Sequence, residues 1–331
     1  MPERASAEPG PVDRALDRSV VLGYARPGYA WRQRGWSDDP QPGELTGKRV
    51  LLTGATSGIG LAAAKALGAL GATVHVHGRD HGRIADALAE LSADVPGGTF
   101  IAECFDVSDL EAVRSWAADF ADRVPSLHAL VHNAGTMTHE RTETEDGHEV
   151  TLAAHVLGPF LLTELLTDLL VADGAGRVIF QSSGGMYNAP LEVDDPEYRE
   201  GKFSGPKAYA RTKRMQVVLA ELWADRLRPR GVAVHSTHPG WVDTPGVRTH
   251  LPKFHAVTRL IIRSLDQGAD TVVWLTAGPN RIEQTGGFWH DRRLRPTTYL
   301  RPAKDGPDER RRLWSYCESA VAAAGAKPSA R

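Results

Sequence analysis

The sequence has few cysteines, no excess of basic residues and no long hydrophobic run. Its two cysteines, Cys104 and Cys317, match no zinc or haem spacing, so the sequence predicts no metal site and fits a reducing cytosol. A formal net charge of -2 provides no basic excess to hold nucleic acid or anionic lipid. The leucine-rich stretch 160–170 is interrupted by two threonines and two acidic residues, which is typical of a buried helix face and not of a membrane span. The start, MPERASAEPGPVDR, lacks the apolar segment of a secretory signal, so we expect a cytoplasmic protein.

The composition divides the chain into three parts. Residues 1–46 form an N-terminal arm, 47–299 a single domain, and 300–331 a charged, peripheral C-terminal tail with room for one short helix. In the arm, arginines alternate with aromatic residues. This pattern favours an arm packed on the domain or on a neighbouring subunit, and the alternative is a helix that contacts a membrane surface or a partner. Pro27 and Gly28 argue against one long helix.

Short β-branched or apolar runs alternate with helical stretches from Lys48 onward. The runs include RVLLTGA, TVHVHGR, HALVHNAG, RVIFQSS and VAVHSTHPG. Strands that alternate with helices of this length predict βαβ crossovers. We therefore expect an α/β, doubly wound Rossmann fold with a mostly parallel sheet of about seven strands and helices on both faces.

The first predicted strand runs directly into the glycine-rich turn TGATSGIG at 53–60. Gly54 permits a tight turn, Gly58 lets the backbone approach a pyrophosphate, and Gly60 lets the next helix sit close to the sheet. The N–H groups and the dipole of that helix end favour phosphate. Such glycines also occur in ordinary turns, but their place between a strand and a helix predicts a dinucleotide site.

The residue type at the end of the second predicted strand indicates which nicotinamide cofactor, NAD or NADP, is preferred. An acid there would bind both ribose hydroxyls of NAD, whereas a cation suits the extra phosphate of NADP. Gly78 stands where the acid is usual and Arg79 follows it, so we expect NADP(H) to be preferred, with NAD(H) as the alternative. Asp80 could instead cap the next helix or pair with Arg79. Asp106, after the third strand, could accept a hydrogen bond from adenine or cap a helix, a role for which Asp109 competes.

Tyr209 and Lys213 lie four residues apart in the helical stretch AYARTKRMQVVLAELW, so both side chains fall on one helix face. A nearby ammonium stabilises phenolate and lowers a tyrosine pKa from about 10 toward the working pH of a general acid/base. Ser182 and Ser183 end the predicted strand RVIFQSS, where a hydroxyl faces the ligand crevice and can bond a carbonyl. Each feature alone is ordinary, but their combination with the glycine-rich turn predicts hydride transfer to or from a carbonyl carbon.

With these motifs, the chain resembles a short-chain dehydrogenase/reductase of the short, single-domain type. The resemblance covers about residues 47–290 through TGATSGIG, DVS, HNAG, VIFQSS, YARTK and HPG. SSGGM, YARTKRMQVVL, HPGWVDTPGV, QGAD and the arm LDRSVV are similar to the group around family member twelve. The resemblance implies that Ser183 polarises the carbonyl, that Tyr209 transfers the proton, and that Lys213 lowers the tyrosine pKa and holds the nicotinamide ribose.

The resemblance also implies a cofactor-binding set. Asn133 and Gly135 would support the sheet and the adenosine side of the cofactor. Pro239 and Gly240 would lie beside the nicotinamide, and Thr244 would reach its carboxamide. Besides Tyr209 and Lys213, the full expected set is Gly54, Thr56, Ser57, Gly58, Ile59, Gly60, Arg79, Asp106, Val107, Asn133, Ala134, Gly135, Pro239, Gly240, Val242 and Thr244.

His155 departs from the family pattern, which has asparagine at this position. That asparagine anchors a water that continues the proton path from the lysine. A histidine can also bind water, and its charge can change near neutral pH. We therefore expect His155 to act in an altered proton relay with a shifted pH profile; the alternative is a histidine that only packs in its helix.

Two loops are expected to form the substrate site. The segment 184–207 is long enough for a flap over the crevice, and 241–265 carries further apolar residues. Ser183, Met186, Tyr187 and Trp241 are the expected substrate-binding residues, for a fairly apolar carbonyl or alcohol. The alternative is that the apolar residues cover the core and leave a small polar site. Lipid-like, steroid-like and retinoid-like substrates stay open.

The predicted function is NADP(H)-dependent interconversion of a carbonyl and an alcohol on a small molecule. Two alternatives stay open: an NADP-binding redox sensor or scaffold without turnover, and an epimerase or dehydratase of the sugar-nucleotide branch. No nucleic-acid partner and no membrane span are expected, although peripheral membrane contact by the arm is one alternative. Members of this family are often homodimers or homotetramers built partly on the helix that holds the tyrosine, so we expect such an oligomer.

Overall fold

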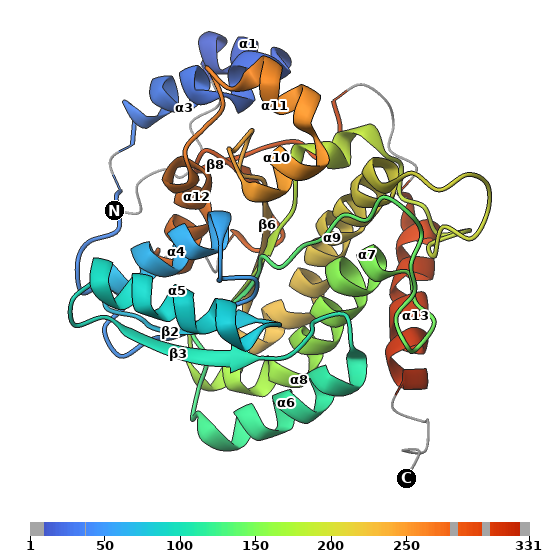
Figure 1. Cartoon of the computed structure of the whole chain (residues 1–331), viewed down its shortest axis with the longest axis horizontal. Helices are drawn as coiled ribbons and strands as arrows, with labels where there is room; N and C mark the ends of the chain where they lie inside the picture. The colour runs from blue at the N-terminus through green and yellow to red at the C-terminus, as the bar shows by residue number, and fades with distance from the viewer. Residues whose placement is uncertain (1–9, 37, 279–283, 300–304, 325–331) are drawn as a thin grey trace.

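The computed structural model describes residues 10–36, 38–278, 284–299 and 305–324, and their strands form one sheet (Figure 1). The strands are β1 (Arg49–Leu52), β2 (Thr73–Gly78), β3 (Thr99–Cys104), β4 (Ala129–His132), β5 (Arg177–Gln181), β6 (Ala233–Thr237), β7 (Phe288–His290) and β8 (Arg293–Leu294). They follow the order β3-β2-β1-β4-β5-β6-β7-β8, and neighbours are parallel except for β7 with β8. The predicted α/β, doubly wound fold is thus confirmed.

The short strand β8 brings the sheet to eight strands, where the sequence predicts about seven. It pairs antiparallel with β7 after a turn in which Asp291 and Arg292 have positive φ angles of 52° and 57°. A strand of two residues shows no alternating pattern, so the sequence offers no signal for it.

Helices cover both faces of the sheet. They are α1 (Pro11–Arg18), α2 (Val20–Tyr24), α3 (Arg26–Gln33), α4 (Gly58–Ala69), α5 (His81–Asp94), α6 (Leu110–Arg123), α7 (Val150–Leu152), α8 (Gly158–Ala172), α9 (Gly205–Leu227), α10 (Pro245–His250), α11 (Pro252–Thr258), α12 (Leu265–Ala277) and α13 (Pro307–Ala324). Side chains alternate along β1: Leu51 packs in the cluster with α6, α8 and α9, whereas Val50 and Leu52 pack with α4 and α12. Burial on both faces explains why these strands read as continuous apolar runs.

The strand order places the ligand crevice. From β1 the chain proceeds to β2 and β3, and it then returns to β4 on the other side of β1. In doubly wound folds, ligands bind outside the carboxyl ends of the strands at such a reversal. The segments expected to bind the cofactor follow β1, β2, β3, β4 and β6, so the fold brings them to this edge of the sheet.

One helical segment of the described chain, Val150–Ala172, is long and apolar enough to cross a membrane by length and composition. It comprises α7, a π-helical turn at Ala153–Leu157 and α8. Of its most apolar window, 83% is buried inside the protein, which agrees with the expected buried helix face.

Both ends of the described chain pack on the domain. The arm forms the three short helices α1 to α3, and Figure 1 shows α1 and α3 beside α11. In the tail that the sequence predicts to be peripheral, α13 buries Leu313, Trp314 and Cys317. The ring of Trp314 lies 4.8 Å, between centroids, from the rings of both Phe160 and Trp223. The helix α13 is therefore a core element.

Candidate active site

The glycine-rich turn between β1 and α4 has a backbone that requires glycine. Gly54 and Gly58 have positive φ angles of 64° and 59°. A Cβ on Gly60 would lie 2.2 Å from the carbonyl oxygen of Gly54, so a side chain there would block the turn. The conformation of the turn therefore explains why glycine stands at these positions. Without side chains there, the N-terminus of α4 stays open to the crevice.

Side chains from β2 and β4 hold this turn. The Asn133 amide donates to the carbonyl oxygens of Thr53 and Gly54, at 3.0 Å each. His77 accepts from the N–H of Gly54 through Nδ1 (3.2 Å), and its Nε2 lies 2.9 Å from the carbonyl oxygen of Phe105. Burial lowers the pKa of His77 to about 4, so the ring is neutral with its proton on Nε2.

Two arginines flank the adenosine end of the crevice. The side chain of Arg79 is 68% exposed. The carboxylate of Asp80 accepts from the N–H of Arg83 (2.8 Å) and so caps α5, which is the alternative that the sequence left open. The Arg83 guanidinium donates to the hydroxyl of Ser57 in the glycine-rich turn, at 3.2 Å. Sequence reasoning missed Arg83, which follows Arg79 by four residues and lies in the first turn of α5.

The competition between Asp106 and Asp109 is resolved by their contacts. Asp109 accepts from two N–H groups at the start of α6 and is its cap. Asp106 accepts from the N–H and the hydroxyl of Ser108 through Oδ1, while Oδ2 lies 3.8 Å from Arg79. The neighbouring Val107 is buried in the core. Asp106 therefore does not cap α6, and its Oδ2 lies beside Arg79.

Ser183, Tyr209 and Lys213 converge at the carboxyl end of β5. The Ser183 hydroxyl accepts from the N–H of Gly185 (3.1 Å). A Cβ on Gly185 would lie 3.5 Å from Ser183 Oγ and 3.9 Å from the ring of Tyr209, so both side chains border the same point. Lys213 Nζ lies 5.5 Å from the centroid of the Tyr209 ring. Ser182 instead donates to the backbone oxygen of Lys213 and faces the helix (2.8 Å).

Burial is the largest cause of the pKa shifts of Tyr209 and Lys213. It raises the pKa of the Tyr209 phenol, against the opposing effect of a hydrogen bond with Ser183. It lowers the pKa of Lys213 to about 7. That Lys213 lowers the pKa of the tyrosine stays a prediction from the resemblance.

Lys213 is held by a glutamine that sequence reasoning missed. Its Nζ donates to the Gln181 carbonyl oxygen (2.8 Å) and to Gln216 Oε1 (3.0 Å). The Gln216 amide N–H donates in turn to the carbonyl oxygen of His155, at 2.9 Å. In an α-helix that carbonyl would accept from residue 159, but Pro159 has no N–H. The π-helical turn leaves this carbonyl available, and Gln216 connects it to Lys213.

The ring of His155 is buried and fully bonded. Nε2 accepts from the N–H of Thr136 (3.0 Å), so the proton is on Nδ1, which lies 2.8 Å from the hydroxyl of Thr212. Burial, and secondly the charge of Lys213, lower the pKa of His155 well below 6.5. This direction opposes the expectation that His155 changes charge near neutral pH. Both ring nitrogens have protein partners, so the expected water is not the ring's partner here.

The segment after β6 faces the glycine-rich turn. Gly240 has a φ of 80°, and a Cβ there would lie 2.6 Å from Nε of Arg263. Arg263 also donates to the carbonyl oxygen of Pro239 (3.2 Å). The hydroxyl of Thr244 caps α10, and its Cγ2 lies 3.9 Å from the position of a Cβ on Gly58. Val242 is buried, so it supports this segment from inside.

The expected substrate residues divide into two groups. Met186 is fully buried and packs with Val217 and Phe288, so it supports the core and does not line the crevice as expected. Tyr187 donates its hydroxyl to the carbonyl oxygen of Pro296 (2.7 Å). The ring of Trp241 lies 5.0 Å, between centroids, from that of Phe254 and belongs to the second loop, 241–265.

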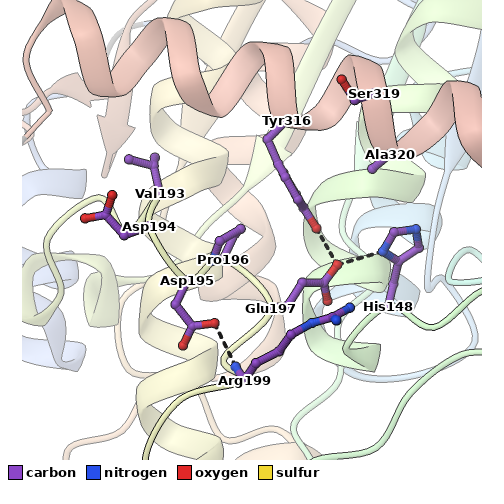
Figure 2. Close-up of a pocket in the computed structure, with 10 residues that line it drawn as sticks. All are labelled: His148, Val193, Asp194, Asp195, Pro196, Glu197, Arg199, Tyr316, Ser319 and Ala320. Carbon is purple, nitrogen blue, oxygen red and sulfur yellow. Dashed lines mark hydrogen bonds and ion pairs between the residues drawn. The ribbon is translucent and has the colours of Figure 1, made fainter.

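A cavity of about 520 Å³ lies beside the first loop, between 193–199 and α13 (Figure 2). Its Glu197 carboxylate accepts from His148 Nδ1 (2.7 Å) and from the hydroxyl of Tyr316. Glu197 also accepts from the N–H of Glu149 (2.7 Å). None of the lining residues belongs to the candidate active site. These contacts attach the Glu197 part of the 184–207 segment to α13 and to 148–149.

Comparisons with known proteins agree with this geometry. Residues 48–194 match the family described as short chain dehydrogenase. The chain is 38% identical over 299 residues to dehydrogenase/reductase SDR family member 12 of Bos taurus, covering 89% of this chain and 93% of that protein. It is 31% identical over 306 residues to retinol dehydrogenase 14 of Mus musculus, covering 88% and 90% respectively. A crystal structure of an uncharacterized protein from Mycobacterium paratuberculosis aligns with a TM-score of 0.68 at 24% identity, covers 87% of this chain and 98% of that chain, and supports the fold.

The similarity extends over most of the chain and over most of these relatives. The chain therefore belongs to the short-chain dehydrogenase/reductase family, in the group similar to member 12, and it is an oxidoreductase that acts on CH–OH groups.

Proposed function

We propose that the chain interconverts a carbonyl and an alcohol on a fairly apolar small molecule, with NADP(H) as the preferred cofactor. The observation that carries the proposal is the convergence of Ser183, Tyr209 and Lys213 at the sheet edge that also holds the glycine-rich turn.

The crevice fits a dinucleotide. Glycines at the turn leave room for a pyrophosphate beside the N-terminus of α4, and the preference for NADP rests on Arg79 and Arg83 at the adenosine end. When bound, the nicotinamide supplies or accepts the hydride.

The proton steps follow from the contacts of the three residues. In reduction, the Ser183 hydroxyl binds the carbonyl oxygen, and Tyr209 donates its phenolic proton to that oxygen. The raised pKa of Tyr209 keeps this proton in place at neutral pH. An ammonium has three N–H groups. Lys213 donates two to Gln181 and Gln216, which leaves one for a ribose hydroxyl.

An apolar substrate is supported by the aromatic residues of the loops that follow β5 and β6, which include Tyr187, Trp241 and Phe254. The name of the relative retinol dehydrogenase 14 also specifies an apolar alcohol.

We also propose that the protein is cytoplasmic.

We further propose that the chain does not form an oligomer through α9. Of the 23 residues of α9, 15 are buried within the single chain, and Trp223 packs against Trp314 of α13. A homodimer or homotetramer of the expected kind would need the surface of this helix, which the chain itself covers.

Turnover is tested by following NADPH absorbance with a panel of apolar ketones and aldehydes. Tyr209→Phe should lower kcat by about 10²–10⁴-fold while NADPH binding, followed by fluorescence, is retained. Tyr198→Phe is the matched control, because that buried tyrosine contacts Lys202 in the 184–207 loop. NADPH binding by the unmodified chain without turnover of any substrate would support the redox sensor instead.

Cofactor preference is tested by titration with NADP and NAD. Arg79→Ala and Arg83→Ala should each weaken NADP binding by about 10–100-fold, since a hydrogen bond to a charged group contributes about 1.5–3 kcal/mol. NAD binding should change little. Equal affinities for both cofactors before and after the substitutions would refute the NADP preference.

A further inference from the structure

The N-terminal arm reaches the catalytic end of the sheet. Tyr24, the last residue of α2, is 3% exposed. Its ring centroid lies 4.6 Å from that of His238, 5.2 Å from that of His290 and 6.4 Å from that of Trp241. These residues follow or end β6 and β7, so Tyr24 lies at the carboxyl edge of the sheet, where the crevice opens.

The ring of Tyr24 also lies against Gly184, the residue that follows Ser183. A Cβ on Gly184 would lie 2.9 Å from Cε2 of Tyr24. Such a contact is too short for a side chain, so glycine at 184 is what admits the ring. Tyr24 thus lies between Gly184 and the segment after β6.

The backbone of the arm orders the second substrate loop, 241–265. The carbonyl oxygen of Tyr24 accepts from the N–H of Trp241 (2.8 Å), and the N–H of Arg26 donates to the carbonyl oxygen of Ile261 (2.7 Å). The arm therefore bonds both ends of this loop.

Buried charges fix the arm in this place. Arg32 of α3 contacts Asp13 and Asp17 of α1 and Asp291 after β7, at 2.6, 2.8 and 2.7 Å. Arg263, at the end of the second loop, also contacts Asp291, at 2.5 Å. Arg263 also donates to the carbonyl oxygen of Gly23 in α2 (3.0 Å). Without the arm, Asp291 would lose Arg32 and Arg263 would lose this carbonyl, both in a dry environment. These buried ion pairs therefore hold the arm, and with it Tyr24, against the domain.

We propose that Tyr24 is a specificity-determining residue: its ring forms the wall of the substrate site on the β7 side of Ser183 and limits the bulk of the group attached to the carbonyl carbon there. The proposal rests on the proposed function of this site. On this proposal, the arm takes part in substrate selection. The wild-type protein then accepts apolar carbonyl compounds that carry one slender substituent on the carbonyl carbon.

The test compares two carbonyl substrates, an unbranched aliphatic aldehyde and a ketone with a fused bicyclic substituent. Tyr24→Ala should raise kcat/KM for the bicyclic ketone relative to the aldehyde by about tenfold or more, because the size of a side chain in an apolar pocket discriminates by about 10–200-fold. Tyr24→Leu, which keeps more of the buried apolar volume, should give a smaller change in the same direction. Trp31→Ala is the control, because Trp31 lies in the same arm with 49% exposure.

Affinities of the same two compounds for the NADP-loaded protein, measured by calorimetry, give a second readout. If wild type turns over neither compound, the proposed function fails while the ratio of the two affinities still tests Tyr24. An unchanged ratio in both Tyr24→Ala and Tyr24→Leu, with folded variants and wild-type NADP affinity, would overturn the proposal. A Tyr24→Ala chain that does not fold would leave Tyr24→Leu to decide by the same ratio.

Discussion

Arg32→Met should destabilise the whole domain, because Arg32 joins the arm to the sheet in a buried site. Its guanidinium is bonded through Nε to Asp13, through Nη2 to Asp17 and through Nη1 to Asp291. The residue is 4% exposed, so water does not replace these contacts. Methionine fills a similar volume without donating any hydrogen bond.

The magnitude follows from the charges that remain. Removal of one partner from a buried ion pair destabilises a protein by about 3–5 kcal/mol, since the other charge stays in a dry environment. Here three carboxylates lose a donor, although Arg263 and Arg295 still contact them. We expect Arg32→Lys to recover little of the lost stability, because the ammonium of lysine cannot replace a planar guanidinium that contacts three carboxylates.

The measurement is the free energy of unfolding in urea at neutral pH, followed by tryptophan fluorescence and circular dichroism. Arg311→Met is the matched control, because the ion pair of Arg311 with Asp308 has side chains that are 70% and 69% exposed. This control should change the free energy of unfolding little. A loss below about 1 kcal/mol for Arg32→Met, the range of exposed pairs, would refute the reasoning.

Three further predictions concern Gln216, His155 and Glu103. Gln216→Met removes a hydrogen-bond acceptor from the Lys213 ammonium, so the pKa of Lys213 and the alkaline limb of the kcat–pH profile should move to lower pH. Gln216→Glu places a negative charge there and should move the limb to higher pH. Shifts of both variants in the same direction would contradict the contact between Gln216 and Lys213. His155→Asn should lower kcat without moving this profile, because burial already keeps the ring neutral, and a moved profile would show that it titrates. Burial would raise the pKa of Glu103, but hydrogen bonds from His75, Arg123 and Trp116 outweigh it and lower the pKa to about 2. The resulting stability is present above the ordinary pKa of 4.5 and is lost as the pH falls toward 2, so thermal unfolding of Glu103→Gln should depend less on pH in this window.

The part of the fold that could be predicted from the sequence is the part with a local pattern. The strands β1, β2, β4, β5 and β6 are short, mostly β-branched or apolar runs that alternate with helices, which is enough to predict a parallel sheet. The strand β8 has two residues and exists through its pairing with β7, so it has no pattern of its own. The burial of α13 is also a tertiary effect, because the helix begins with a run of charged residues while Trp314 packs against the distant Phe160.

The candidate site divides in the same way. Tyr209 and Lys213 could be found because both lie on one helix face, and the glycine-rich turn because its residues are consecutive. The role of Gln216 depends on the carbonyl oxygen of His155, which is 61 positions away in the chain. Sequence spacing offered only a weak signal, a glutamine three residues after Lys213. The charge state of His155 likewise depends on burial, which no spacing reveals.

The covering of α9 by its own chain has a consequence for experiments on mixtures of chains. If each chain completes its catalytic helix alone, the activity per chain should stay constant on dilution. Active chains mixed with Tyr209→Phe chains should then show activity in proportion to the active fraction, with neither rescue nor inhibition by the inactive partner. In an enzyme whose catalytic helix is also half of a subunit interface, the geometry of one tyrosine depends on the neighbouring subunit, and such mixtures depart from proportionality.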